Sequence, residues 1–517
     1  MSKNNKIDIF KKWLYKDYSI SLPQNITDIL LKEGIPKDKI IPASKIIHFL
    51  SEMPWYTQEK LLEDTGLLKE ELIKLNKLIH SSDLLQQMIV FEGLGKKYWN
   101  TMLSHVKSGN IEKVINYEYS LPLRLTLFPG MSCMYYCGFC GRNQKAKYKT
   151  KDVLEIGAQK FKDAISSLPK GSTISISGGL EPLTNMKLGE IITHGKKLGF
   201  KIPLITNAHM LTPKYLKMQS GIWDLDSLRI SLYGTDQDST FDVTRHPKAY
   251  ELVKNNIIEF VKERNKTKSN LKIGINYIII PENIHTVLPL LDYINEVNSH
   301  VDGQGIDFLT IRDDFGSVTE INDDVDKSVD GRKYHLEGFL SDKQRKKLVS
   351  LFNEFNKRRK IECPELHVDF GYAMMALGEG ILGKPLARVK GTEMRKSGYP
   401  QLSVAMDSHG DIFLHKEAGF LDRPGNKKFI AGRVTEKKSF TNVFEEFINN
   451  KHVIDLDHDD DRFMDSYDHL VTLLVNQAES DINTGIPFEL GPVKLRNKNY
   501  YGTNTDLSNN WYKDESN

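Results

Sequence analysis

The chain has 517 residues, of which 39% are hydrophobic and 27% are charged, and its 71 basic side chains nearly balance 68 acidic ones. These are ordinary values for a globular protein of two or three domains, and a net charge of +3 does not indicate a nucleic-acid or membrane surface. Because the sequence shows no signal-peptide pattern and no apolar run near the about 18 residues that span a bilayer, we expect a cytoplasmic protein without a nucleic-acid or membrane partner.

Residues 1–120 are predicted to form an N-terminal helical domain. A possible helix N-cap, Ser44, precedes an apolar segment that begins at Ile46. Four apolar residues recur at helical spacing and would form one face of a second helix: Leu68, Leu72, Leu75 and Ile79. We find no chemistry in this region, so a packing role is favoured over a ligand-binding one.

From residue 121 onward, short β-rich segments alternate with helical ones. Six strands are predicted, at 121–128, 173–177, 202–206, 228–232, 272–280 and 306–312. Helices are predicted between them, at 155–168, 186–198, 250–263 and 284–297. This alternation predicts right-handed βαβ units and a parallel sheet. The fold class is therefore α/β, a partial (β/α)6 barrel over residues 121–330, followed by a C-terminal α+β extension over 331–517.

Three of the four cysteines lie within eight residues, directly after the first predicted strand, at Cys133, Cys137 and Cys140. Because iron–sulfur clusters are normally held by four cysteine thiolates, a C-x3-C-x2-C run predicts a [4Fe–4S] cluster with one iron open to another ligand. A structural zinc site needs a fourth ligand, and a disulfide framework needs an even cysteine count in a secreted chain. A cysteine-rich turn without metal is the remaining alternative. Barrel sites lie in loops after the strands, so we expect the cluster at that mouth.

The cysteine spacing resembles that of the radical S-adenosylmethionine (SAM) enzymes. In that family the amino and carboxylate groups of SAM chelate the open iron, so the resemblance implies a [4Fe–4S] cluster and SAM as cofactors. Phe139, just before the third cysteine, resembles the aromatic residue that lies against the adenine of SAM. Loop packing is the alternative role for Phe139.

A glycine pair follows the second predicted strand. Gly178, Gly179 and Glu181 resemble the Gly-Gly-Glu motif of the radical SAM family, with Leu180 interposed before the acid. Glycine allows the backbone to approach a ligand closely and to adopt positive φ. We therefore expect this loop to bind SAM, whereas an ordinary turn is the alternative.

Three polar residues at the next strands are also candidates for SAM binding. Asn207 follows the third strand and is placed to bond the ribose, while Arg229 and Ser231 on the fourth strand would flank the same cavity. For each of them, packing in the sheet or in a loop is the alternative.

Further segments narrow the resemblance, in the same order along residues 99–484. They are 177–185, 230–234, 367–373, 416–420, 430–435 and 463–468. Together they resemble the radical SAM TDP-4-amino-4,6-dideoxy-D-glucose deaminases of desosamine biosynthesis and their close relatives. The resemblance implies a lyase that consumes SAM and deaminates a nucleotide-linked 4-amino-4,6-dideoxy sugar to the 3-keto sugar. It also implies a one-electron reductase partner, such as flavodoxin or ferredoxin.

Two kinds of alternative remain open. A radical SAM dehydrogenase of a deoxysugar or another small molecule would begin with the same hydrogen abstraction. An RNA-modifying radical SAM enzyme would need a basic, aromatic-bearing surface, and a non-catalytic metal protein would not need the glycine pair.

Candidate substrate-binding residues lie downstream of the barrel. A nucleotide diphosphate requires cations, and a group of basic residues follows position 387, namely Arg388, Lys390, Arg395 and Lys396. A solvated charged face is the alternative. Arg433 is a candidate for contact with the sugar, and Glu417 is a candidate general acid or base during ammonia loss.

The fourth cysteine, Cys363, cannot build a second cysteine-bound cluster and is predicted to be a buried small residue. A hairpin is predicted at 401–415. It resembles the strand pair that delivers a further cysteine in many peptide-modifying radical SAM enzymes, but here His415 and Lys416 occupy that position. We therefore expect one cluster and a small-molecule substrate.

Overall fold

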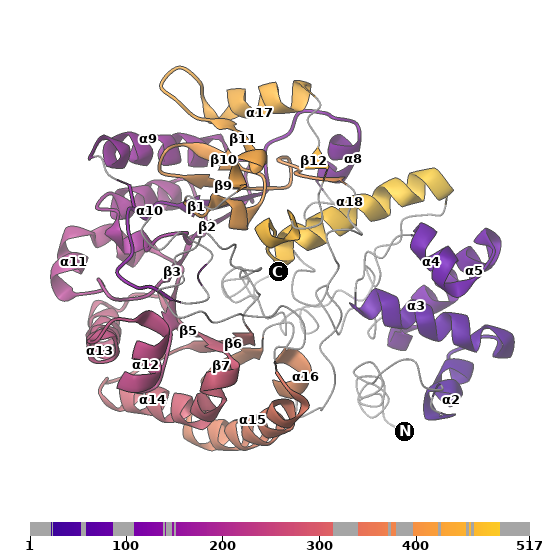
Figure 1. Cartoon of the computed structure of the whole chain (residues 1–517), viewed down its shortest axis with the longest axis horizontal. Coiled ribbons are helices and arrows are strands. Elements are labelled where there is room, and N and C mark those ends of the chain that lie inside the picture. The colour runs from indigo at the N-terminus through magenta and orange to yellow at the C-terminus, as the bar shows by residue number, and fades with distance from the viewer. Residues whose placement is uncertain are drawn as a thin grey trace.

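The computed structural model describes residues 22, 24–52, 58–85, 108–137, 140, 147–148, 151–313, 340–370, 374–378, 396–421, 425–450, 454–455 and 460–485. Within them, ten strands form one sheet in the order β11-β10-β9-β1-β2-β3-β4-β5-β6-β7, and β8 (Lys396–Ser397) and β12 (Ile454–Asp455) pair separately. Figure 1 shows helices α9 to α15 in an arc around the outside of the curved sheet, with α18 on its other side.

All six predicted strands are present and run parallel to one another. They are β1 (Arg124–Phe128), β2 (Thr173–Ile176), β3 (Pro203–Thr206), β4 (Ser227–Leu232), β5 (Lys272–Ile279) and β6 (Phe308–Asp313). The outer helices are α9 (Lys151–Ser167), α10 (Leu188–Lys197), α11 (Pro213–Met218), α12 (Gln237–Thr244), α13 (Ala249–Thr267), α14 (Val287–Ser299) and α15 (Asp342–Glu362). The predicted α/β partial barrel is therefore confirmed.

Segments from beyond residue 330 extend both edges of this sheet. At one edge, β7 (His367–Phe370) pairs in parallel with β6. At the other edge, β9 (Ser403–Asp407) pairs in parallel with β1, and β10 (Asp411–Phe413) and β11 (Ile430–Arg433) follow antiparallel. The hairpin predicted at 401–415 is thus confirmed as β9 and β10, and it also belongs to the barrel sheet. The domain boundaries at 120 and 330 stay predictions.

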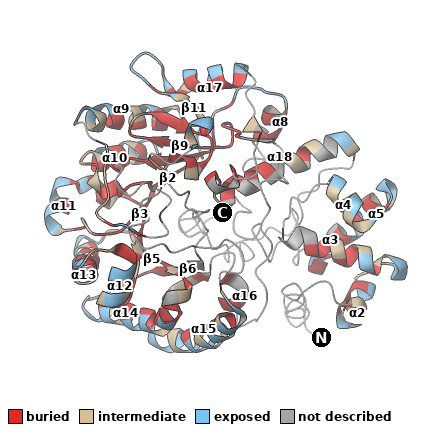
Figure 2. Ribbon diagram, in the orientation of Figure 1, coloured by how far each residue is buried: buried red, intermediate tan, exposed pale blue. Residues whose placement is uncertain are grey.

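The two faces of the sheet differ in chemistry. Side chains facing the helices form the apolar core, with Leu125 and Leu127 of β1 packed in the same cluster as Phe161 of α9. On the other face, the hydroxyls of Thr126 on β1 and Ser175 on β2 lie 3.2 Å apart. Figure 2 shows the strands buried and the outer helices buried on the side toward the sheet. The apolar alternation fixes which face the helices cover and leaves polar side chains inside the barrel.

The N-terminal helices have an apolar cluster of their own. They are α2 (Gln24–Lys32), α3 (Ile40–Glu52), α4 (Gln58–Thr65) and α5 (Lys69–Ser81). Leu72, Leu75 and Ile79 are buried on α5 as predicted, but Leu68 is 69% exposed because it precedes the helix. Ser44 is not a cap either: it lies inside α3, where its hydroxyl donates to the carbonyl of Ile41.

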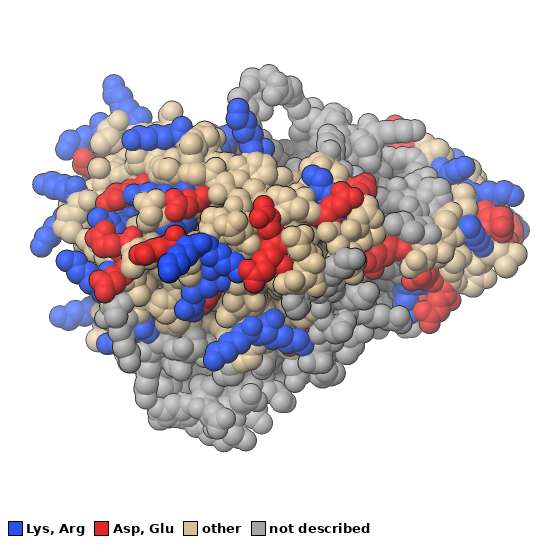
Figure 3. Space-filling view, turned by 90° about the horizontal axis from the view of Figure 1, so that it is seen from above, with Lys and Arg blue, Asp and Glu red and all other residues tan. Residues whose placement is uncertain are grey.

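Further elements lie before β1 and in the C-terminal part. These are α8 (Asn110–Ile115), α16 (Met375–Gly378), the turn η7 (Lys416–Gly419), α17 (Phe440–Asn449) and α18 (Ser466–Thr484). The guanidinium of Arg124 lies 3.9 Å from the ring centroid of Tyr467, so α18 contacts the start of β1. On the face drawn in Figure 3, basic and acidic side chains stand side by side. Among the described residues, none of the helices is long and apolar enough to cross a membrane.

A buried carboxyl, Asp407 at the end of β9, makes the stability of the hairpin depend on pH. It accepts hydrogen bonds from the backbone N–H groups of His409 and Asp411 and from the hydroxyl of Tyr148, at 2.8–3.0 Å. Burial, and then the nearby charge of Asp411, raise the pKa of Asp407 to about 7. Because the unfolded pKa is about 3.9, the folded state holds this proton more tightly, so the stabilisation is complete below pH 4 and is lost as the pH rises through 7.

We expect Asp407→Asn to remove this pH dependence, because an uncharged amide can keep all three contacts. Between pH 5 and pH 8, the free energy of unfolding should fall by about 2–3 kcal/mol more for the wild type than for the variant. Denaturant titrations of both proteins at several pH values measure this difference. Parallel pH profiles would contradict the prediction.

Candidate active site

The cysteine loop leaves the carboxyl end of β1 and is tied to the loop after β2. The backbone N–H groups of Met131 and Ser132 both donate to the hydroxyl of Thr184, at 2.8 and 3.1 Å. The N–H of Glu181 in turn donates to the carbonyl of Ser132 at 2.9 Å. Thr184 belongs to the segment 177–185 that the sequence singled out, but its part as a clamp between two loops was not predicted.

Glu181 links the loops after β2 and β3. One oxygen of its carboxylate accepts from the N–H of Leu183 at 3.1 Å and the hydroxyl of Thr206 at 2.5 Å, and the other accepts from the N–H of Asn207 at 2.8 Å. Burial raises the pKa of Glu181, and the three hydrogen bonds oppose that rise. The carboxylate therefore braces two loops at the barrel mouth, while its predicted contact with SAM stays a prediction.

This brace holds Asn207 beside the cysteine loop. The amide nitrogen of the Asn207 side chain lies 3.7 Å from the sulfur of Cys133 and 3.2 Å from that of Met134. The next residue, Ala208, has a φ of 58°, which is uncommon for a residue other than glycine. Asn256 of α13 donates to the carbonyl of Ala208 at 3.0 Å and so supports this turn. Strained turns held by their surroundings are concentrated at functional sites.

Close contacts of the backbone require the glycine pair, and its predicted contact with SAM stays a prediction. Neither Gly178 nor Gly179 has positive φ. A Cβ at Gly178 would lie 2.2 Å from the carbonyl oxygen of Leu180, and one at Gly179 would lie 2.9 Å from Cα of Phe420. The expectation of positive φ is therefore wrong, and close backbone contact is what excludes a side chain here.

An aromatic cluster beside Cys137 was missed by the sequence reasoning. The ring of Tyr135 meets those of His209, Tyr233 and His246 edge-on, at centroid distances of 5.4, 5.9 and 5.7 Å. Burial raises the pKa of Tyr135, and burial together with His246 lowers the pKa of His209. Both groups are thus held neutral at pH 7. Their positions are a useful signal: Tyr135 lies in the cysteine loop, His209 and Tyr233 follow β3 and β4, and His246 follows α12.

The predicted substrate residues divide into two groups. Glu417 lies on η7, whose neighbour Phe420 packs against Gly179, so this turn reaches the loop after β2. Arg433 forms a two-pronged ion pair with Asp411, at 2.6 and 2.7 Å. The roles of Glu417 and Arg433 stay predictions. Three other residues predicted for the substrate lie outside the described residues, namely Arg388, Lys390 and Arg395, and so does Phe139, which was predicted to lie against the adenine of SAM.

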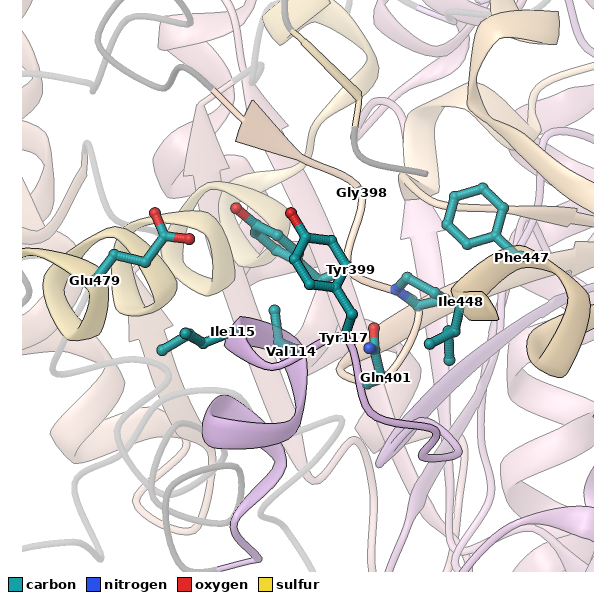
Figure 4. Close-up of a pocket in the computed structure, with 10 residues that line it drawn as sticks. Val114, Ile115, Tyr117, Gly398, Tyr399, Gln401, Phe447, Ile448 and Glu479 are labelled. Atoms are coloured by element: carbon teal, nitrogen blue, oxygen red, sulfur yellow. The ribbon is translucent and has the colours of Figure 1, made fainter. Parts of the chain in front are cut away.

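A small pocket lies at the opposite end of the sheet (Figure 4). Its lining includes Val114, Ile115 and Tyr117, which precede β1, and residues 398–401, which precede β9, together with residues of α17 and α18. Its volume is about 30 Å³, room for about one water molecule. It is therefore too small for a nucleotide sugar, and it lies at the amino ends of the strands, away from the cysteine loop.

The residues at the mouth fit the predicted iron–sulfur cluster and SAM. In the part of the chain that the structure describes, none of the three cysteines forms a disulfide; Cys137 is buried, while Cys133 and Cys140 are partly exposed. Three thiolates are a suitable ligand set for a cluster that keeps one iron open. Asn207 beside Cys133 supplies an amide, and Arg229 and Ser231 reach the inside of the barrel from the neighbouring strand. Their roles toward either group stay predictions.

Comparison with known proteins gives the family. The chain is 32% identical over 434 residues to a dTDP-4-amino-4,6-dideoxy-D-glucose ammonia-lyase from Streptomyces venezuelae, covering 84% of this chain and 86% of that protein. The chain belongs to this family. A shorter match, 22% identical over 208 residues, is to an S-adenosylmethionine-dependent nucleotide dehydratase from Psychrobacter lutiphocae and covers 38% of this chain and 65% of that protein. The family resemblance expected from the sequence is thus confirmed.

Solved structures and family models say less about the family than the curated relative does. The crystal structure of Streptococcus suis SuiB bound to S-adenosylmethionine matches with a TM-score of 0.41 and 17% identity, over 74% of this chain and 77% of that one. Native anSMEcpe with bound AdoMet and the Cp18Cys peptide matches with a TM-score of 0.39 and 16% identity, over 70% and 97%. No protein-family model matches the chain. Membership of the ammonia-lyase family therefore rests on the curated relative.

Proposed function

We propose that this chain is a radical SAM ammonia-lyase that releases ammonia from dTDP-4-amino-4,6-dideoxy-D-glucose or a close nucleotide-linked analogue. The observation that carries the proposal is the match to the ammonia-lyase relative, which extends over 434 residues and is not limited to the cysteine loop. The three cysteines at the mouth of the barrel and the braced loop after β2 support it. A dehydrogenase would share the cluster loop, so the fate of the amino group separates the two.

The cofactors proposed are one [4Fe–4S] cluster, held by Cys133, Cys137 and Cys140, and SAM. When bound, they would supply a 5′-deoxyadenosyl radical, which can take a hydrogen atom from the sugar carbon next to the amine-bearing carbon. The residues of the chain do the rest: the Glu181 brace keeps the two loops in place, and the polar barrel interior orients the sugar. Loss of ammonia from the neighbouring carbon, with one further electron and a proton, leaves the keto sugar.

The proposal also covers the electron donor, the compartment and the residues that bind the diphosphate. A one-electron reductase such as flavodoxin or ferredoxin supplies the electrons, and the cytoplasm, where thiols stay reduced, is the proposed compartment. For the diphosphate, the basic residues after position 387 stay the candidates. For the sugar, Arg433 is a weaker candidate, because its guanidinium is already paired with Asp411.

The test is a product balance with reduced enzyme, SAM and dTDP-4-amino-4,6-dideoxy-D-glucose. We expect ammonia and 5′-deoxyadenosine in equal amounts, together with a keto sugar that has lost its nitrogen. A ketone that retains the nitrogen would make the protein a dehydrogenase. Formation of deoxyadenosine without any change in the sugar would show that the substrate is misassigned.

A further inference from the structure

Four polar side chains from neighbouring strands stand in one row across the sheet. In the parallel register, Ser231 on β4 is the Cα partner of Asn276 on β5, Asn276 of Thr310 on β6, and Thr310 of Asp369 on β7. Paired positions in a parallel sheet project their side chains to the same face. We call these four residues the lumen row.

The alternation along each strand shows which face this is. The residues on either side of Asn276, Ile275 and Tyr277, are buried in the core beneath the helices, as are the neighbours of Thr310, Leu309 and Ile311. Because successive side chains of a strand point to opposite faces, the lumen row faces the interior of the barrel.

Two members of the row carry polar atoms for which the described residues offer no hydrogen-bond partner. Asn276 and Thr310 are 3% and 2% exposed, and in the part of the chain that the structure describes, the Asn276 side-chain oxygen and the Thr310 hydroxyl have no hydrogen-bond partner. Leaving such a group buried costs about 1–3 kcal/mol, so nearly all buried polar groups are bonded in folded proteins. Barrel interiors are usually filled by valine, isoleucine and leucine, which would avoid this cost. The unbonded atoms therefore point to a ligand.

Two residues nearer the amino ends of the strands, an aromatic ring fills the barrel interior beneath the lumen row. Gly274 on β5 pairs with Phe308 on β6, and a Cβ at Gly274 would lie 2.0 Å from the Phe308 ring, so the ring lies directly over the glycine. The guanidinium of Arg229 is 5.9 Å from the centroid of the same ring. Since the row lies two residues further toward the carboxyl ends of the strands, it faces the mouth that holds the cysteine loop.

We propose that the lumen row binds the sugar ring of the substrate, with Asn276 and Thr310 bonded to its hydroxyl groups and Asp369 facing its amino group. An amide and a hydroxyl can each pair with a sugar hydroxyl, and a buried carboxylate stabilises an ammonium. Asp369 is 1% exposed and lies at the β7 end of the row. Ser231, a predicted SAM contact, stands at the other end, so the row places the sugar next to the cofactor. This inference rests on the proposed function.

The test measures binding rather than turnover. Affinity for dTDP-4-amino-4,6-dideoxy-D-glucose is determined by calorimetry on the unreduced holoenzyme with SAM, for the wild type and for Thr310→Val, Asn276→Leu and Asp369→Asn. We expect about tenfold weaker binding for the first two variants and a larger loss for Asp369→Asn, because a bond to a charged group is stronger. Iron content should be unchanged. The thermal midpoints of Thr310→Val and Asn276→Leu should be equal to or above that of the wild type, since each removes an unbonded buried group.

A matched control is Tyr293→Phe, which removes another buried hydroxyl that lacks a partner among the described residues, this one in the outer helix α14. It should leave sugar affinity unchanged. Wild-type affinity in Thr310→Val and Asn276→Leu would overturn the row as the sugar site while the proposed function stands. Failure of the wild type itself to bind the amino sugar would instead overturn the proposed function, and this inference with it.

Discussion

Alanine in place of Cys133, Cys137 or Cys140 is expected to abolish 5′-deoxyadenosine formation. Each substitution removes one of three thiolates, and no other cysteine lies near enough to replace it. Anaerobically reconstituted wild type should hold about four irons per chain, with an EPR signal in the reduced state that shifts on addition of SAM. Each variant should lose iron and the SAM-dependent shift together.

Cys363→Ala is the control for this series. Cys363 is buried at the end of α15, where its thiol donates to the Asn295 side chain at 2.5 Å. It precedes β7 and therefore lies at the amino end of the parallel strands, opposite the cysteine loop. We expect normal iron content and normal deoxyadenosine formation. Full activity in any one of the three loop variants would refute the assignment of the cluster.

Removal of the Glu181 carboxylate should have the second largest effect. In Glu181→Leu, the buried N–H groups of Leu183 and Asn207 lose their acceptor, which should cost about 3 kcal/mol or more. The thermal midpoint should fall by several degrees. SAM affinity should fall as well, because the Asn207 turn beside Cys133 is no longer held. Thermal unfolding and SAM titration of the same preparations measure both effects.

A one-atom change gives a graded version of this experiment. In Glu181→Gln, the amide oxygen can accept either from the N–H of Asn207 or from the N–H of Leu183 and the hydroxyl of Thr206. The NH2 group then faces the remaining donor and cannot accept from it. Stability should therefore lie between those of the wild type and Glu181→Leu. The matched control is Glu190→Gln on the surface of α10, where the ion pairs with Lys162 and Lys187 are each worth less than about 1 kcal/mol. Equal losses at positions 181 and 190 would contradict the bracing role.

Local sequence patterns were enough to predict the barrel strands and the cysteine loop. The six strands and the four intervening helices are recognised from the alternation of apolar residues, because each such pattern depends only on neighbours along the chain. The cysteine spacing likewise lies within eight residues and carries its chemistry with it. Family membership was also readable, since the segments that carry it keep their order along the chain.

The tertiary structure alone decided which distant residues meet. The pairing of β9 with β1 joins segments nearly 280 positions apart, and the Glu181 brace depends on the loop after β3 lying beside the loop after β2. The glycine pair looked like a positive-φ turn, yet contact with Leu180 and Phe420 is what requires it. The lumen row can be recognised only from the register of four strands, because its four residues lie far apart in the sequence. Sequence periodicity gives the face of one strand, whereas register between strands is set by packing across the whole sheet.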